Sequence, residues 1–129
     1  RNLGSEGLFV SDIYGGPEAQ ELVEETTVHD DFHYLWDQDE FDPIQSRMSC
    51  HIHFELPSGE RLERAFSYDW RLWTIPEVRE VLTEAGFAAT EIYWEGIEES
   101  SDEGNGVFTL QTTAENTESW TAYIVGIKE

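Results

Sequence analysis

Residues 65–87 read AFSYDWRLWTIPEVREVLTEAGF, and this stretch decides the fold. Its first part alternates, with apolar side chains on one face of an expected strand: Phe66, Tyr68, Trp70 and Leu72. A period of two is typical of a half-buried β-strand. The period then changes to that of a helix, so a strand is predicted to turn a sharp corner into a helix.

The helical part of this stretch carries signals at both of its ends. Thr74 is a candidate N-cap, and Glu77 completes a capping box three residues later. Pro76 falls in the first turn, where its missing N–H removes no hydrogen bond. Gly86 suits the left-handed conformation that ends a helix. The apolar stripe expected to face the core comprises Ile75, Val78, Val81, Leu82 and Ala85, with Phe87 folding back on it.

Two apolar strands are predicted toward the ends of the chain. Residues 7–14 form a nearly continuous apolar run between turns, which favours a central strand covered on both faces. Residues 120–128 alternate like a strand, and residues 90–95 predict another. Residues 18–25 predict a short acidic helix that Pro17 opens.

Three antiparallel strands are expected in the middle, over residues 28–38, 47–56 and 62–72. They form a meander with one aromatic-rich apolar face and one polar face, and the apolar face is expected to line a pocket. Strands at both ends with a helix between them predict an α/β fold in one domain or fragment. Its parts are a core strand and helix over 1–26, the meander insertion over 27–73, and a helix with two C-terminal strands over 74–129.

Composition excludes several classes of protein. The chain has 129 residues and a net charge of −21, so its surface would repel nucleic-acid phosphates and anionic lipid. Its apolar runs are all shorter than the roughly 20 residues that span a bilayer. Cys50 has no partner for an internal disulfide, which fits a reducing, cytoplasmic setting. The chain begins with Arg1 rather than Met, and residues 1–4 resemble the end of a helix, so a fragment of a longer protein is expected.

The order of these segments resembles the C-terminal half of a class I S-adenosylmethionine-dependent methyltransferase. The resemblance rests on a late strand reading EGLFVSDIY (6–14), the helix end AGF (85–87), the strand EIYW (91–94), and a last strand (120–128) that inserts antiparallel beside its neighbours. The segment YDWRLWTIPE (68–77) is similar to the small-molecule branch of that family. The resemblance implies the C-terminal part of a Rossmann-like sheet with an antiparallel, substrate-side meander.

The family's cofactor signature is missing from the sequence. It consists of a Gly-rich turn after the first strand and an acidic residue that ends the second. Gly15-Gly16-Pro17 follows a strand but lacks the G-x-G-x-x-G spacing. The resemblance therefore implies S-adenosylmethionine as the cofactor of a longer parent enzyme, and this chain alone is expected to bind it weakly and to be inactive.

Substrate-binding roles follow from the resemblance for Tyr14, Tyr68, Trp70 and Arg71. Arg71 could clamp a carboxylate of a small-molecule substrate. The aromatic rings could cage a cationic amine. The alternative is that Tyr68 and Trp70 belong to the core and that Arg71 pairs with an acid. Methyl transfer demands no signature triad, so no catalytic residue is assigned.

A metal site and a different function stay open. His51 and His53 share a strand face, and His-x-His can chelate a metal, but a solvated or hydrogen-bonded polar face is the favoured interpretation and no metal ligands are assigned. The competing function is a self-contained α+β domain that binds a ligand or a protein without catalysis. A closed sheet would favour that domain, whereas pairing of residues 7–14 with the C-terminal strand and a free sheet edge would favour the methyltransferase. A homodimer through that edge is also expected.

Overall fold

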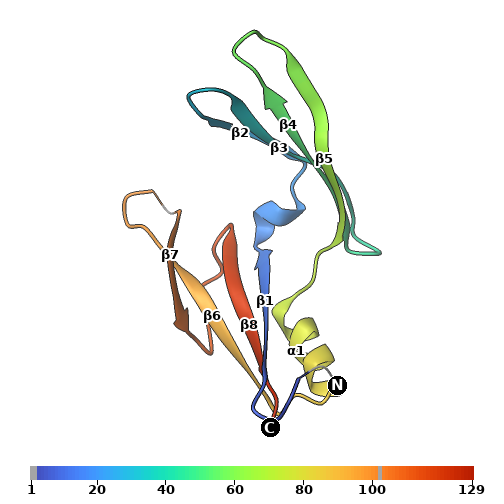
Figure 1. Cartoon of the computed structure of the whole chain (residues 1–129), viewed down its shortest axis with the longest axis vertical. Coiled ribbons are helices and arrows are strands. Elements are labelled where there is room, and N and C mark those ends of the chain that lie inside the picture. The colour runs from blue at the N-terminus through green and yellow to red at the C-terminus, as the bar shows by residue number, and fades with distance from the viewer. Residues whose placement is uncertain (1–2, 102) are drawn as a thin grey trace. The chain divides into compact units, whose positions relative to one another are not determined.

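The computed structural model describes residues 3–101 and 103–129, which form two compact units (Figure 1). The first unit comprises the chain up to Ala19 and from Trp73 onward, and the second comprises Gln20–Leu72. The helix end expected at residues 1–4 lies partly outside the described residues. Within the described part of the chain, no helix is long and apolar enough to cross a membrane.

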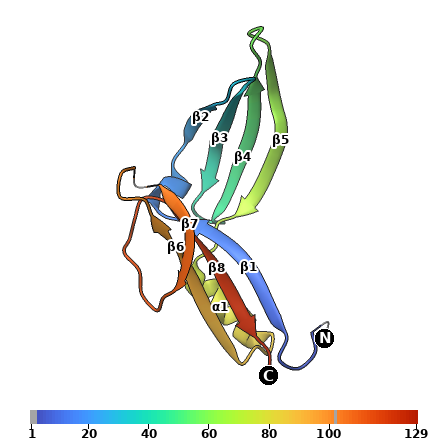
Figure 2. The ribbon, with the colours of Figure 1, turned by 60° about the vertical axis from the view of Figure 1, so that its left-hand side comes forward.

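The first unit contains a four-stranded sheet in the order β1-β8-β6-β7, with every neighbouring pair antiparallel. Its strands are β1 (Leu8–Gly15), β6 (Ala89–Ile97), β7 (Gly104–Leu110) and β8 (Trp120–Ile127). Because β8 runs antiparallel to both β1 and β6, those two strands point in the same direction (Figure 2). The predicted pairing of the first strand with the C-terminal strand is confirmed.

Helix α1 (Ile75–Glu84) has the ends that the sequence predicts. The Thr74 side chain accepts a hydrogen bond from the Glu77 backbone N–H, and the Glu77 carboxylate accepts one from the Thr74 N–H at 2.9 Å. At the other end, Gly86 has φ +102°. The N–H groups of Gly86 and Phe87 donate to the carbonyls of Thr83 and Leu82, both at 3.1 Å, which is a Schellman motif.

The core of the first unit lies between α1 and the sheet. Its buried residues are Leu82, Ile92, Ala122 and Ile124. Phe87 packs against them, as expected, and its ring lies over Gly126, where a side-chain Cβ would come within 3.0 Å of it. Val81 was expected in the apolar stripe but is half exposed, because it lies to one side of the face that meets β6 and β8.

The prediction that β1 is covered on both faces is wrong for this chain. Leu8, Phe9 and Val10 are 56%, 43% and 58% exposed. The reason is that β1 is an edge strand and that α1 packs against β6 and β8. One side of β1 hydrogen-bonds β8, and among the described residues no strand pairs with its other side.

The second unit is a four-stranded antiparallel meander rather than the predicted three strands. It comprises β2 (Val23–Val28), β3 (His33–Asp42), β4 (Arg47–Glu55) and β5 (Arg61–Arg71), in that order. The helix expected over residues 18–25 is only a 3₁₀ turn, η1 (Pro17–Gln20), after which β-branched residues favour β2. The strand expected over 28–38 is interrupted because the chain turns at residues 29–32, where the His29 N–H donates to the Phe32 carbonyl.

The expected α/β class also needs correction. The described residues form two antiparallel sheets and a single α-helix, and no parallel strand pair forms among them. A short acidic segment joins β6, which extends to Ile97, to β7, which begins at Gly104.

Candidate functional site

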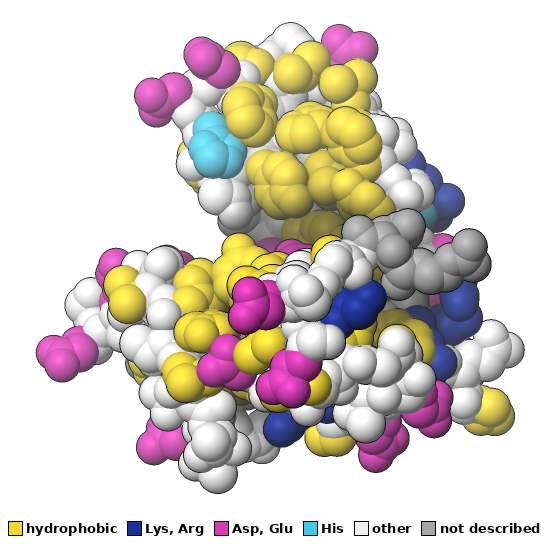
Figure 3. All heavy atoms as spheres, turned by 60° about the horizontal axis from the view of Figure 1, so that its bottom comes forward, with side chains coloured by type: hydrophobic (Ala, Val, Ile, Leu, Met, Phe, Trp, Pro, Cys, Tyr) yellow, Lys and Arg dark blue, Asp and Glu magenta, His cyan; other side chains and the backbone are white. Residues whose placement is uncertain are grey.

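One side of the β2–β5 sheet, which we call the aromatic face, gathers hydrophobic side chains (Figure 3, upper part). Directly opposed residues of neighbouring strands share a face, so the pairing register identifies its members. They include Tyr34, Trp36, Met48, Cys50, Ile52, Phe54, Phe66, Tyr68 and Trp70. The predicted apolar and polar faces of the meander are thereby confirmed.

Three large rings on this face form a continuous platform. The centroids of Tyr68 and Trp70 lie 4.5 Å apart, and Trp36 lies 6.3 Å from Tyr68 and 6.1 Å from Trp70. Their interplanar angles are 31–34°, so the rings are tilted stacks rather than the perpendicular walls of a cage. Trp70 is 38% exposed, so the platform offers a ring surface to a ligand.

Hydrogen bonds hold the position of Trp36. Its indole Nε1–H donates to Gln38 Oε1 at 3.0 Å, and Gln38 Nε2 donates to the Glu21 carbonyl at 2.7 Å. Gln38 is thus fixed by the segment that precedes β2 and fixes the indole in turn. The ring surface is held in place before any ligand arrives.

Two titratable groups on the aromatic face have raised pKa values. Burial, and secondarily the nearby Tyr68 hydroxyl, raise the pKa of Tyr34. Burial raises the pKa of the Cys50 thiol to about 11, with smaller contributions from Asp37 and Asp39. Cys50 is fully buried, so it is a small core residue and not a nucleophile.

The polar face contains His51 and His53, for which the sequence left a metal-binding role open. His51 and His53 are 6% and 2% exposed, so this part of the face is hydrogen-bonded but not solvated. His51 Nδ1 lies 2.8 Å from Ser67 Oγ, and its Nε2 lies 3.1 Å from Asp39 Oδ2. Both ring nitrogens therefore have protein partners.

The tautomer of His53 follows from its partners. The Arg64 backbone N–H donates to His53 Nδ1 at 2.8 Å, so that nitrogen is the acceptor. Nε2 then carries the proton and donates to Asp37 Oδ2 at 3.0 Å. Arg64 has φ +49°, a conformation that side chains disfavour, and it directs this N–H at the ring.

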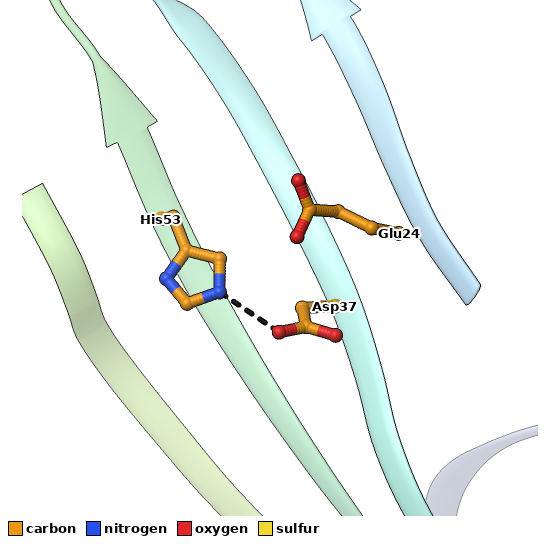
Figure 4. A group of neighbouring side chains, drawn as sticks. All are labelled: Glu24, Asp37 and His53. Carbon is orange, nitrogen blue, oxygen red and sulfur yellow. Dashed lines mark hydrogen bonds and ion pairs between the residues drawn. The ribbon is translucent and has the colours of Figure 1, made fainter. Parts of the chain in front are cut away.

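Glu24, Asp37 and His53 come close enough to be considered as a metal site (Figure 4). A metal bound through His53 Nε2 would move the ring proton to Nδ1, where it would meet the Arg64 N–H, a second donor. Glu24 also pairs with Arg61 at 3.3 Å. The donor set therefore fits a structural His–Asp hydrogen bond better than a metal centre.

The structure brings together only some of the residues predicted to bind substrate. Tyr68 and Trp70 lie side by side on the aromatic face. Arg71 follows Trp70 and lies on the opposite face, in register with Arg47. Tyr14 belongs to the other unit, where it pairs with Thr121 of β8.

Sequence reasoning missed the part that Trp36 plays in this platform. The alternation of Tyr34 and Trp36 is visible in the sequence, but the contact of Trp36 with Tyr68 and Trp70 depends on the register of three strands. A pairing register is set by nonlocal contacts, so no local signal could have revealed it.

Comparison with known proteins supports a fold relationship. Neither a protein-family model nor a curated protein matches the sequence. Among solved structures, a S-adenosylmethionine-dependent methyltransferase from Clostridium acetobutylicum is similar, with a TM-score of 0.55 and 16% identity over 98% of this chain and 47% of that one. The CcbJ methyltransferase from Streptomyces caelestis is similar as well, with a TM-score of 0.54 and 15% identity over 95% of this chain and 44% of that one. The chain has a methyltransferase-like fold and spans less than half of each of these proteins.

Proposed function

We propose that this chain is the C-terminal, substrate-side part of an S-adenosylmethionine-dependent methyltransferase that acts on a small molecule. The observation that carries the proposal is the strand order β1-β8-β6, in which the C-terminal strand is inserted antiparallel between two strands that point the same way. The likeness to two methyltransferases supports it.

The free side of β1 supports the view that a further part of the enzyme completes this sheet. Leu8, Phe9 and Val10 are exposed apolar residues on an unpaired edge, which soluble proteins usually cover. We propose that a strand of the cofactor-binding half pairs there. A self-contained binding domain would be expected to close its sheet, and the open edge disfavours that alternative.

We expect the binding site for S-adenosylmethionine to lie in the rest of the proposed parent enzyme and not among the described residues. β1 ends at Gly15 and leads into the four-residue turn η1, so it provides no glycine-rich turn into an α-helix that could hold a cofactor's ribose and carboxylate groups. S-adenosylmethionine, when bound by the parent, would supply an activated methyl group. The part played by this chain would be to orient the acceptor and to exclude water.

Within that part, the aromatic face is the proposed wall of the substrate site. Trp70 would contact the substrate through its exposed ring, and the half-buried Tyr68, whose ring centroid lies 4.5 Å away, would extend that surface. Arg71 lies on the opposite face of this sheet and Tyr14 belongs to the first unit, and roles for them in substrate binding stay predictions.

Calorimetry with S-adenosylhomocysteine tests the proposal. A polypeptide extended by the gene sequence upstream of Arg1 is expected to bind it with micromolar affinity, and the present chain is expected not to. The upstream sequence itself should encode a strand, a glycine-rich turn and a helix. Micromolar binding by the present chain, or an upstream sequence without that motif, would contradict the proposal.

In isolation, the chain is proposed to form a homodimer through the free edge of β1. An unpaired apolar strand is a template for pairing with a second copy. Sedimentation at moderate salt should then show a dimer. A substitution that places a charge on the edge, such as Val10→Lys, should weaken this dimer. A monomer at all accessible concentrations would contradict this.

A further inference from the structure

We propose that the aromatic face binds a small organic cation, meaning a quaternary or protonated amine, on the platform formed by Trp36, Tyr68 and Trp70. This inference deepens the function proposed above and rests on it, because it names the chemical class of the substrate.

The ring geometry suits a cation that sits against an outward ring face of the stack. The three centroids are 4.5–6.3 Å apart, and the rings are tilted by 31–34°. Stacked rings cover each other's facing surfaces, so a trimethylammonium-sized group would sit on an outward ring face, within about 6 Å of its centroid, which is the range of cation–π attraction. Phe66, which is 55% exposed, extends the apolar surface along β5 for the rest of the ligand.

The charge distribution favours a cation over a neutral apolar ligand. The second unit contains 13 acidic residues and four arginines. Glu25 pairs in register with Trp36, so its carboxylate lies on the aromatic face beside the platform. Among the residues in strand register on this face, within the described part of the chain, Glu25 carries the one charge.

Arg47 and Arg61 do not compete for this site. Arg47 pairs with Asp69 at 2.9 Å and Arg61 with Glu24 at 3.3 Å, both on the opposite face of the sheet. A ligand cation on the platform would therefore find Glu25 without having to displace either of these arginines.

The platform is organised in advance, which lowers the cost of binding. The bond from Trp36 to Gln38, and from Gln38 to the Glu21 carbonyl, holds the indole in one orientation. Fewer rotamers must then be ordered when the ligand binds.

The test is a proton NMR titration of the full chain with choline and, separately, with its neutral isostere in which a tert-butyl group replaces the trimethylammonium group. Ring currents should move the choline methyl signal upfield, and choline should bind about tenfold more tightly than the isostere, as expected for attraction to a partly desolvated ring face. No upfield shift, or equal affinity for the two compounds, would overturn the proposal.

Matched variants separate the platform from diffuse attraction by an acidic protein. Trp70→Leu and Tyr68→Leu should each weaken choline binding several-fold, and Trp70→Phe, which keeps a ring, should weaken it less. Tyr123→Leu is the control, because Tyr123 is 39% exposed and lies in the other unit. Equal effects in Trp70→Leu and Tyr123→Leu would overturn the proposal.

A second pair of variants tests the part played by the Glu25 carboxylate. Glu25→Gln should weaken choline binding about twofold to threefold, the size expected for an exposed charge. Glu24→Gln removes the same charge from the opposite face of β2 and should leave binding unchanged. The choline titration needs no S-adenosylmethionine, so a negative titration would contradict the cation site and leave the proposed methyl transfer standing. Failure of the extended polypeptide to bind the cofactor would contradict the proposed methyl transfer and leave the choline result unaffected.

Discussion

The hydrogen bond between the Arg64 backbone and His53 gives a quantitative prediction about the stability of the second unit. His51 and His53 are adjacent buried histidines of β4, with side chains 8% and 3% exposed, and each bonds an aspartate of β3. Replacing either by Leu removes one bond to a carboxylate. The two sites differ in the partner of Nδ1, which is the rotatable, exposed Ser67 hydroxyl for His51 and the backbone N–H of Arg64 for His53.

This difference sets the expected magnitude. In His51→Leu the Ser67 hydroxyl can turn to water, so the loss should be about 1–2 kcal/mol, the size of a bond to a charged group partly open to solvent. In His53→Leu the Arg64 N–H loses its acceptor and cannot rotate away, which adds about 1–2 kcal/mol. Arg64 at φ +49° also loses the contact that holds it in a disfavoured conformation.

Amide hydrogen exchange of the full chain measures both effects, because it reports the opening free energy of each strand separately. His53→Leu should lower protection across β3–β5 by more than His51→Leu, and exchange of the Arg64 amide should accelerate most. His53→Asn is the matched control, since its Oδ1 occupies nearly the position of Nδ1 and should restore protection of Arg64, whereas His53→Gln should not. Equal losses in the two Leu variants, or an unchanged Arg64 amide, would refute the reasoning.

Four further predictions concern caps, titration and salt. Thr74→Ala should lower the unfolding free energy of the first unit by about 1 kcal/mol, and Thr74→Ser should not, by thermal denaturation followed by circular dichroism. Cys50, with a pKa of about 11, should resist a thiol reagent at pH 8 until the protein unfolds. The hydrogen bond that Asp69 accepts from Arg47 lowers the pKa of Asp69, so NMR titration should find that pKa below the usual aspartate range, and Arg47→Gln should return it to that range. Any stability that the pair contributes is present above the unfolded-state pKa and is lost as the pH falls through the lowered, folded-state pKa. With a net charge of −21, the unfolding midpoint should rise with added salt but not with an equal osmolality of a neutral solute.

Local signals made much of the first unit predictable. The capping box at Thr74, the terminating Gly86 and the alternation around Ile124 each depend on neighbours within a few residues, and the structure confirms all three. The order of elements was enough to predict that the C-terminal strand pairs with β1.

The parts that sequence could not supply depend on long-range pairing. The acidic segment of β2 looks like a helix start, and only its pairing with β3 makes it a strand. The bulges near Gln38 and His53 shift the register of the meander, and with it the position of Trp36 and the aim of the Arg64 amide. The exposure of β1 could not be foreseen either, because alternation and apolarity describe a strand without saying how many neighbours it has.

The position of β8 in the sheet bears on how the protein emerges from the ribosome. β6 can pair with β7 as soon as both are made, but β8 is the one described strand that pairs with β1, so β1 cannot join the sheet until the last strand has been synthesised. The β2–β5 meander, by contrast, is continuous in sequence and joins each strand to the next one made. During translation the meander can therefore assemble early. The apolar strand β1, which precedes it, stays unpaired until more than a hundred further residues have been made. Until then it depends on chaperones, or on another part of the nascent protein, to avoid aggregation.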